Sequence, residues 1–197
     1  MSVRLPAAER RHQLLDTALR TFARQGYHEA SMNEIADAAG VTKPVLYQHF
    51  GSKRDLYLEV LREEGDELRE RVRAAASGAP SPHQQVLRGF RAWFGWVAEN
   101  PDGFVVVFGG DVRRDPDFAA ESSKVEAQIA DVIADLIAVQ GLSDDRRRLL
   151  AYGIVGLGES TCRRWLARDI HLDADDLAEQ VADLTWAGLR GLRPDDT

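Results

Sequence analysis

Residues 31–50 read SMNEIADAAGVTKPVLYQHF, and this stretch predicts two short helices joined by a tight turn. Ser31 and Glu34 have the Ser-x-x-Glu spacing of a capping box, in which a hydroxyl and a carboxylate satisfy the free backbone amides at a helix start. Gly40 ends the first helix, and Pro44 falls in the first turn of the second, where an amide proton would have no partner. The pattern is typical of a helix-turn-helix unit, whose second helix enters the DNA major groove.

The sequence on either side of this stretch completes a helical domain. Apolar residues recur every three or four positions between Leu14 and Ala23, which predicts an amphipathic helix that Gly26 ends. A further helix begins near Lys53 and soon becomes highly charged, as is typical of a connector between two bodies. We therefore expect a helix-turn-helix DNA-binding domain over residues 1–55.

The rest of the chain also predicts helices. The Gly- and Pro-containing stretch 77–82 is the clearest linker, and no segment longer than a few residues has the alternation of a strand. Helices are expected at roughly 83–99, 102–109, 116–140, 143–169 and 173–192. The expected fold class is all-α, with a three-helix N-terminal domain followed by a larger helical domain over residues 56–197.

Charge is divided unevenly along the chain. The 197 residues carry a net charge of −7, which by itself argues against binding to nucleic acid. Residues 1–55, however, hold 8 Lys/Arg and 6 Asp/Glu, a balance of +2, and the remaining 142 residues have a balance of −9. This asymmetry indicates a mildly basic part that suits a polyanion and an acidic body with a different role.

Cysteine content and hydropathy indicate the compartment. Cys162 is the single cysteine, so no disulfide can form within the chain, and a reducing cytosol fits best. The sequence has no apolar run of signal-peptide length at its N-terminus and no stretch near the ~20 apolar residues of a transmembrane helix. We expect a cytoplasmic protein without a membrane partner.

The helix-turn-helix residues resemble a known family. Fixed spacings connect Gly26-Tyr27, Ser31, Ile35-Ala36-x-x-Ala39-Gly40-Val41, Leu46-Tyr47-x-His49-Phe50 and Ser52-Lys53-x-x-Leu56. Over about residues 8–60 the chain resembles the N-terminal domain of TetR-family repressors. The resemblance implies an all-α homodimer whose larger C-terminal domain binds a small-molecule ligand and dimerises through its last two helices. In that family, ligand binding usually releases the protein from its DNA operator, for which we expect a palindrome.

The start of the recognition helix is expected to meet the DNA bases. Lys43 can donate to guanine O6 or N7, and Pro44 and Val45 can contact a thymine methyl group. Ser31 and Thr42 lie at predicted helix N-termini, where the helix dipole favours a phosphate. These five residues are therefore DNA-binding candidates.

Further along the same unit, the resemblance implies phosphate contacts for Tyr47, His49 and Lys53. Gln48 can reach either a phosphate or a base. Taken alone, Tyr47 or His49 is more often a packed residue of an amphipathic helix, but the surrounding motif favours the DNA role. The basic residues before and within the first helix (Arg4, Arg10 and Arg11) have two readings, a minor-groove arm or, as the favoured one, a solvated face.

Aromatic residues in the second domain suggest a small-molecule site or a filled core. Most of them fall between residues 90 and 118, a density that can line an apolar cavity with a few polar groups, although such a stripe is more often core. Glu159 and Arg163 are spaced i,i+4 and can simply pair with each other. The ligand-binding candidates are Trp93, Phe94, Phe104, Phe108, Tyr152, Glu159 and Arg163.

Two C-terminal helices are candidates for the dimer interface. Gly153, Gly156 and Gly158 fall in one helix, where each glycine is unfavourable by about 1 kcal/mol against alanine. That pattern suggests close helix contact. The helices at 143–169 and 173–192 can form a four-helix bundle across a two-fold axis.

The sequence leaves three other interpretations open. An enzyme is not favoured, because the five histidines lie far apart and no metal-ligand spacing, P-loop or dinucleotide fingerprint is present. We therefore expect no catalytic residue, no metal site and no cofactor.

An adaptor that kept the fold and lost specific DNA binding is the main alternative. The acidic body supports it, and the intact Lys43, Tyr47 and Lys53 oppose it. Cys162 can be a redox sensor beside Arg163, but a buried structural cysteine is favoured.

Overall fold

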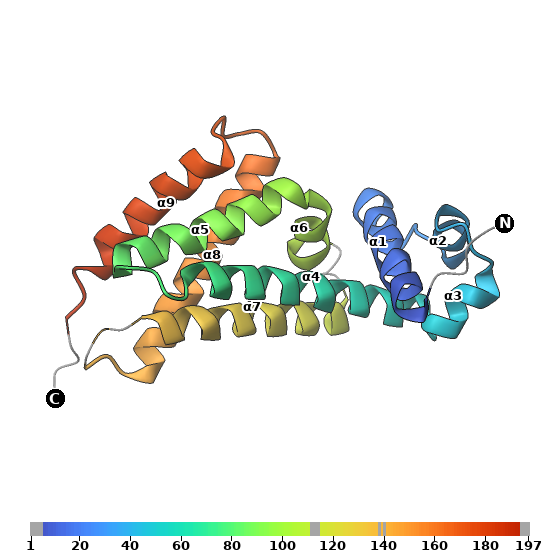
Figure 1. The fold of residues 1–197 in the computed structure, drawn as a ribbon, viewed down its shortest axis with the longest axis horizontal. Coiled ribbons are helices and arrows are strands. Elements are labelled where there is room, and N and C mark those ends of the chain that lie inside the picture. Colours follow the sequence, from blue (N-terminus) through green and yellow to red (C-terminus); the bar gives the residue numbers. More distant parts are fainter. Residues whose placement is uncertain (1–5, 111–114, 138, 140, 194–197) are drawn as a thin grey trace. The chain divides into compact units, whose positions relative to one another are not determined.

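Every regular secondary-structure element in the part that the structure describes is a helix. The computed structural model describes residues 6–110, 115–137, 139 and 141–193, and these contain helices but no strand (Figure 1). The expected all-α fold class is therefore confirmed. The helices are α1 (Ala7–Gln25), α2 (Met32–Ala38), α3 (Lys43–His49), α4 (Lys53–Ala76), α5 (Pro82–Glu99), α6 (Pro101–Phe108), α7 (Pro116–Leu136), α8 (Asp144–Leu166) and α9 (Ala174–Leu189).

Local sequence signals set the boundaries of the first helices. Gly26 follows α1 with φ 82°, and Gly40 follows α2 with φ 67°, both in the left-handed region that glycine enters at little steric cost. The capping box at the start of α2 is present. The Ser31 hydroxyl accepts a hydrogen bond from the Glu34 backbone N–H, and the Glu34 carboxylate accepts one from the Ser31 backbone N–H. Pro44 occupies the first turn of α3.

The residues divide into two compact units. The first contains residues 1–64 and 102–122, and the second contains residues 65–101 and 123–197. The divisions fall within α4, nine residues beyond the boundary expected at residue 55, after Pro101 at the start of α6, and within α7. The first unit consequently holds α6 and the start of α7 in addition to the helix-turn-helix.

In the first unit, α1, α2 and α3 pack around fully buried aliphatic side chains, including Leu14, Ile35 and Leu46. Beside them the ring of Tyr57 on α4 stacks edge-on against that of Phe22, with 5.0 Å between ring centroids. The rings of Tyr57 and Phe118 are 4.5 Å apart, so α7 extends the core of this unit.

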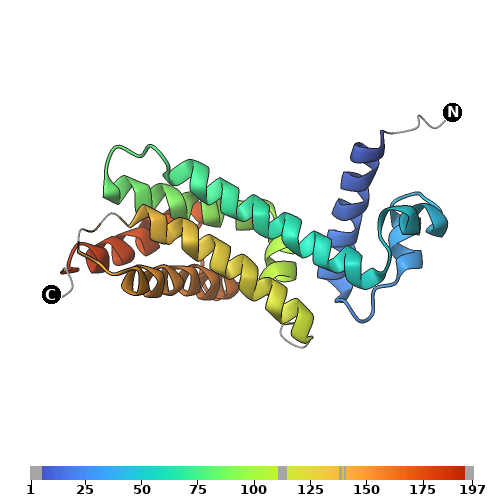
Figure 2. The same ribbon diagram turned by 90° about the horizontal axis from the view of Figure 1, so that it is seen from below.

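In the second unit, α5 and α9 run side by side (Figure 1). Trp96 and Phe94 of α5 are fully buried. The second half of α4 runs along α7 (Figure 2), and a Cβ placed on Gly65 would lie only 2.5 Å from Cγ1 of Val125. Glycine at position 65 therefore permits the close approach of these two helices. Within the described residues, none of the helices is long and apolar enough to cross a membrane.

Candidate DNA-binding surface and ligand cavity

The recognition helix α3 is anchored on one face and open on the other. Leu46 is 0% exposed, and Phe50 at its C-terminal cap is also buried. Lys43 and Gln48 are exposed, and Tyr47 is 42% exposed, which is unusual for a large aromatic side chain. Because the apolar positions hold the helix and the polar positions point outward, α3 can offer its side chains to a groove ~12 Å wide.

The first turn of α3 carries no acidic residue. Pro44 is exposed, Val45 is half-buried, and the Lys43 ammonium lies 5.9 Å from the centroid of the Tyr47 ring. Thr42 caps the helix through its backbone conformation, while its exposed side chain makes no capping hydrogen bond. His49 is half-buried at the other end of the helix. This surface has positive charge and free hydrogen-bonding groups.

Ser31 and Lys53 differ from the other DNA-binding candidates because the fold already uses their polar groups. The Ser31 hydroxyl donates to Glu34 Oε2 at 2.8 Å. The Lys53 ammonium donates to the carbonyl oxygens of Tyr27, His28 and Ala30 at 2.6, 3.1 and 2.7 Å. All three ammonium protons are thus directed at the segment between α1 and α2. We infer that Lys53 positions this segment, rather than reaching out to a phosphate as the resemblance implied.

The environment of Lys53 supports this inference. Its ammonium also lies 4.5 Å from the centroid of the Tyr27 ring. Partial burial lowers the pKa of Lys53 from its ordinary value, while Glu29 and Glu34 oppose that shift. Sequence spacing could not reveal this role, because the three carbonyl groups lie more than twenty residues away along the chain.

The basic residues of α1 are also engaged within the protein. Arg11 pairs with Glu59 at 2.8 Å and lies 4.8 Å from the Phe50 ring centroid, and Arg10 donates to Gln13 at 2.7 Å. Arg4 lies outside the described residues. The helical placement of Arg10 and Arg11 agrees with the favoured reading of a solvated helix face.

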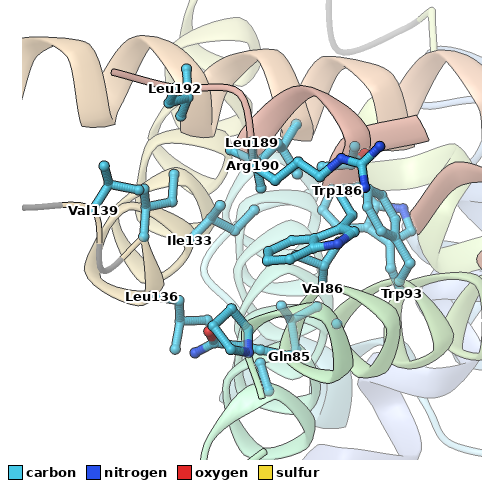
Figure 3. Close-up of a pocket in the computed structure, with 18 residues that line it drawn as sticks. Gln85, Val86, Trp93, Ile133, Leu136, Val139, Trp186, Leu189, Arg190 and Leu192 are labelled. Atoms are coloured by element: carbon cyan, nitrogen blue, oxygen red, sulfur yellow. The ribbon is translucent and has the colours of Figure 1, made fainter. Parts of the chain in front are cut away.

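A cavity of about 280 Å³ lies within the second unit (Figure 3). Residues of α4, α5, α7, α8 and α9 line it, and most of these residues are apolar. This volume lies just below the usual ~300–1,000 Å³ of small-molecule sites, and a mainly apolar wall with a few polar groups matches their composition. The lining residues include Gln85, Gly89, Trp93, Thr185, Trp186 and Arg190.

Of the seven ligand-binding candidates from the sequence, Trp93 lines this cavity. Phe94 is fully buried in the second unit and packs on Trp165, with 6.3 Å between ring centroids. Phe104 and Phe108 pack on each other in α6, which belongs to the first unit.

The other three candidates lie on α8. Tyr152 is 48% exposed, and Glu159 forms an ion pair with Arg163. None of the three lines the cavity. Thr185, Trp186 and Arg190 line the cavity but are not among the sequence candidates, because the last helix is expected to serve dimerisation. The available signal is that this helix has apolar residues on more than one face.

Cys162 is a buried residue rather than an exposed thiol. Its side chain is fully buried, and burial raises its pKa to about 12, although a hydrogen bond from the Trp93 side chain works in the opposite direction. A thiol with that pKa is neutral at pH 7 and therefore a poor nucleophile. Within the part that the structure describes, no three His, Cys, Asp or Glu side chains cluster in a way that could hold a metal ion.

An anchored recognition helix with an outward polar face, followed by a helical unit with a cavity, is the arrangement of a helix-turn-helix DNA-binding protein with a second helical unit. Family comparison gives the same result. Residues 14–60 match the bacterial regulatory proteins of the tetR family, and residues 82–188 match a tetracyclin repressor-like C-terminal domain. The chain belongs to the TetR family and is a DNA-binding transcriptional regulator.

Individual relatives are similar to this chain over most of its length. The HTH-type transcriptional activator FasR of Mycolicibacterium smegmatis is 39% identical over 187 residues, covering 94% of this chain and 85% of the relative. The HTH-type transcriptional repressor KstR2 of the same organism is 27% identical over 188 residues, covering 92% and 91%.

Solved structures have the same fold. A TetR-like regulator from Rhodococcus sp. RHA1 has a TM-score of 0.77 at 29% identity, covering 96% of this chain and all of the other. FadR from Bacillus subtilis, solved with stearoyl-CoA, has a TM-score of 0.75 at 18% identity, covering 92% and 99%, and supports the fold alone.

Proposed function

We propose that this regulator is a cytoplasmic homodimer whose affinity for a palindromic operator is lowered when an apolar small molecule occupies the cavity of the second unit. The observation that carries the proposal is the cavity itself, about 280 Å³ and walled mainly by apolar side chains. Relatives bear the names activator and repressor. In either case the ligand controls how much of the operator is occupied. We propose that the operator-bound protein represses transcription.

For DNA recognition, we propose that Lys43, Pro44 and Val45 read base edges, and that Thr42, Tyr47, Gln48 and His49 hold the sugar–phosphate backbone. Exposed polar side chains on α3 and the absence of acidic residues from its first turn support this division. Each half-site would receive one copy of α3, with half-sites about one helical turn apart or a multiple of that distance.

For dimerisation, we propose that α8 and α9 pack against the same two helices of a second copy. Leu149 and Tyr152 of α8 and Leu184 of α9 are large apolar side chains with exposed fractions of 70%, 48% and 64%. Cβ atoms placed on Gly153 and Gly156 would meet no atom within 4 Å, so this part of α8 has room for a partner helix. A C₂ four-helix bundle would bury these side chains.

The cavity and the proposed dimer surface share α9. Thr185, Trp186 and Leu189 line the cavity, whereas Leu184 is exposed. A ligand that moves α9 would therefore alter the dimer interface as well, and so the spacing of the two recognition helices on DNA. This linkage gives a physical reason why filling the cavity changes operator affinity.

A pair of glycine variants tests the ligand site. Gly89 lines the cavity and Gly95 does not, both lie on α5, and Cβ atoms placed on them would have open space around them. Gly89→Phe should fill the cavity, whereas Gly95→Phe should leave it open. The neutral probe 1-decanol reports binding through the fluorescence of Trp93 and Trp186, the two tryptophans of the wall.

The proposal predicts that 1-decanol binds the parent protein and Gly95→Phe and lowers their affinity for an operator selected from random DNA. Gly89→Phe should bind the same operator and should not respond to 1-decanol. An equal response from all three proteins would contradict the assignment of the cavity, and so would the absence of any response from the parent.

A further inference from the structure

We propose that the natural effector is an amphipathic anion, whose apolar body fills the cavity and whose negatively charged head group binds the guanidinium group of Arg190. This inference rests on the proposed function, because it takes the cavity to be the effector site. It goes further by assigning the chemical class of the ligand and the residue that selects it.

The wall of the cavity consists mainly of apolar side chains and includes one charged side chain. Among the described residues that line it, Arg190 alone carries a charge, and Gln85 and Thr185 are the only other residues with a polar aliphatic side chain. The Thr185 hydroxyl donates to the Val181 carbonyl oxygen at 2.8 Å, so its proton is used within α9. The strongest group left for a ligand is therefore the guanidinium of Arg190.

Arg190 is available to a ligand. Its side chain is exposed, and no described carboxylate forms an ion pair with it. Two other arginines of this unit have carboxylate partners: Arg91 pairs with Glu179 at 2.6 Å, and Arg164 pairs with Asp169 at 3.2 Å. An arginine beside an apolar cavity, with no carboxylate partner among the described residues, can present two parallel N–H groups to a carboxylate or phosphate.

The position of Arg190 suits a head group at the edge of the cavity. It is the C-terminal cap of α9, where a cation offsets the partial negative charge of the helix end. Figure 3 shows its side chain extending along the cavity toward the tryptophans, while Ile133, Leu136 and Val139 lie across from it. An anionic head group at Arg190 would thus leave the apolar body of the ligand among aliphatic side chains.

The volume sets the scale of a suitable probe. At about 30 Å³ for each non-hydrogen atom, the share of one water molecule in the liquid, a cavity of about 280 Å³ accommodates at least on the order of ten such atoms. A ten-carbon chain is therefore a suitable probe. Three decyl compounds differ only in the head group: decanoate is an anion, 1-decanol is neutral, and decylammonium is a cation.

The test measures the affinity of each compound by tryptophan fluorescence, below its micelle concentration, for the parent and for Arg190→Gln and Arg190→Glu. Arg88→Gln serves as a matched control, because Arg88 is exposed on α5 next to Gly89 and does not line the cavity. Operator release, followed by fluorescence anisotropy of labelled DNA, gives a second readout with the same proteins.

The parent and Arg88→Gln should bind decanoate about tenfold more tightly than 1-decanol, which corresponds to ~1.4 kcal/mol. Arg190→Gln should bind these two compounds equally, and Arg190→Glu should prefer decylammonium. Phosphate in place of carboxylate, tested with decyl phosphate, identifies which anion is preferred.

The outcomes separate this inference from the proposed function. If all three compounds bind equally to every variant and still release the operator, the cavity is the effector site but the role of Arg190 is wrong. If decanoate preference persists in Arg190→Gln, another group holds the anion and the inference is also wrong. If no compound changes the tryptophan fluorescence of the parent, and Gly89→Phe gives the same result, both the inference and the cavity assignment fail.

Discussion

Replacing Lys53 by methionine separates a structural role from a DNA contact. The change removes the charge and keeps a side chain of similar length. It abolishes three hydrogen bonds, of 2.6, 3.1 and 2.7 Å, to carbonyl groups between α1 and α2. Hydrogen bonds to a charged group contribute about 1.5–3 kcal/mol in favourable cases. Because water can replace the ammonium at these partly exposed carbonyls, we expect a net loss of about 2 kcal/mol for the three together.

That loss should be visible in thermal unfolding followed by circular dichroism. For a chain of this size 1 kcal/mol corresponds to roughly 2–4 °C, so the midpoint of Lys53→Met should fall by roughly 4–8 °C. Lys43→Met is the matched control, since Lys43 is exposed and its removal should leave the midpoint unchanged.

DNA binding provides the second half of this test. Each lost phosphate contact reduces the slope of log affinity against log salt by about 1. Lys53→Met should weaken operator binding with little change in that slope, because the variant disturbs the support of the helix-turn-helix. The reasoning would be refuted by an unchanged midpoint together with a slope reduced by about 1, since this pair of results identifies Lys53 as a phosphate contact.

Three further predictions concern packing, the thiol and the dimer. Gly65→Ala should destabilise the protein by about 1–3 kcal/mol in urea unfolding, because the added Cβ would lie 2.5 Å from Val125 Cγ1. Adding Val125→Ala to this variant should recover most of that loss. A Gly65→Ala variant as stable as the parent would contradict the close approach of α4 and α7. Cys162 should resist thiol reagents in the folded protein at pH 8. Because the thiol pKa is about 12 in the folded state and its ordinary value is 9.0, the unfolded chain loses this proton first as pH rises. The free energy of unfolding should therefore decrease as pH rises above 9. Rapid modification of the folded protein would show the burial to be wrong. Leu184→Glu should convert dimers to monomers in sedimentation velocity, and an unchanged dimer would place the interface elsewhere.

Features that depend on neighbouring residues could be predicted from the sequence. The Ser31–Glu34 capping box, Pro44 in the first turn of α3 and the glycine after each of the first two helices are local signals, and the structure contains all of them. Helix periodicity likewise predicted the all-α class, because burial of one face is encoded every three to four residues.

Features that depend on distant residues could not be predicted in the same way. The ammonium of Lys53 is bound by carbonyl groups that are 23 to 26 positions away. The cavity forms where five helices converge, so its wall includes Trp186 and Arg190 near the end of the chain and excludes Phe104 and Phe108, which share the aromatic cluster in sequence only. Composition identified an aromatic-rich body but could not say which aromatic side chains face an empty space.

Selection from a library of random DNA duplexes tests the central claim most directly. The folded protein is used to enrich bound sequences over several rounds, and the affinity of the selected duplexes is then measured by fluorescence anisotropy at two salt concentrations. The account predicts one enriched palindrome, with binding that weakens steeply as salt rises and that Lys43→Ala and Tyr47→Ala reduce without unfolding the protein. Failure of a folded, dimeric protein to enrich any sequence, or undiminished binding by both variants, would contradict it.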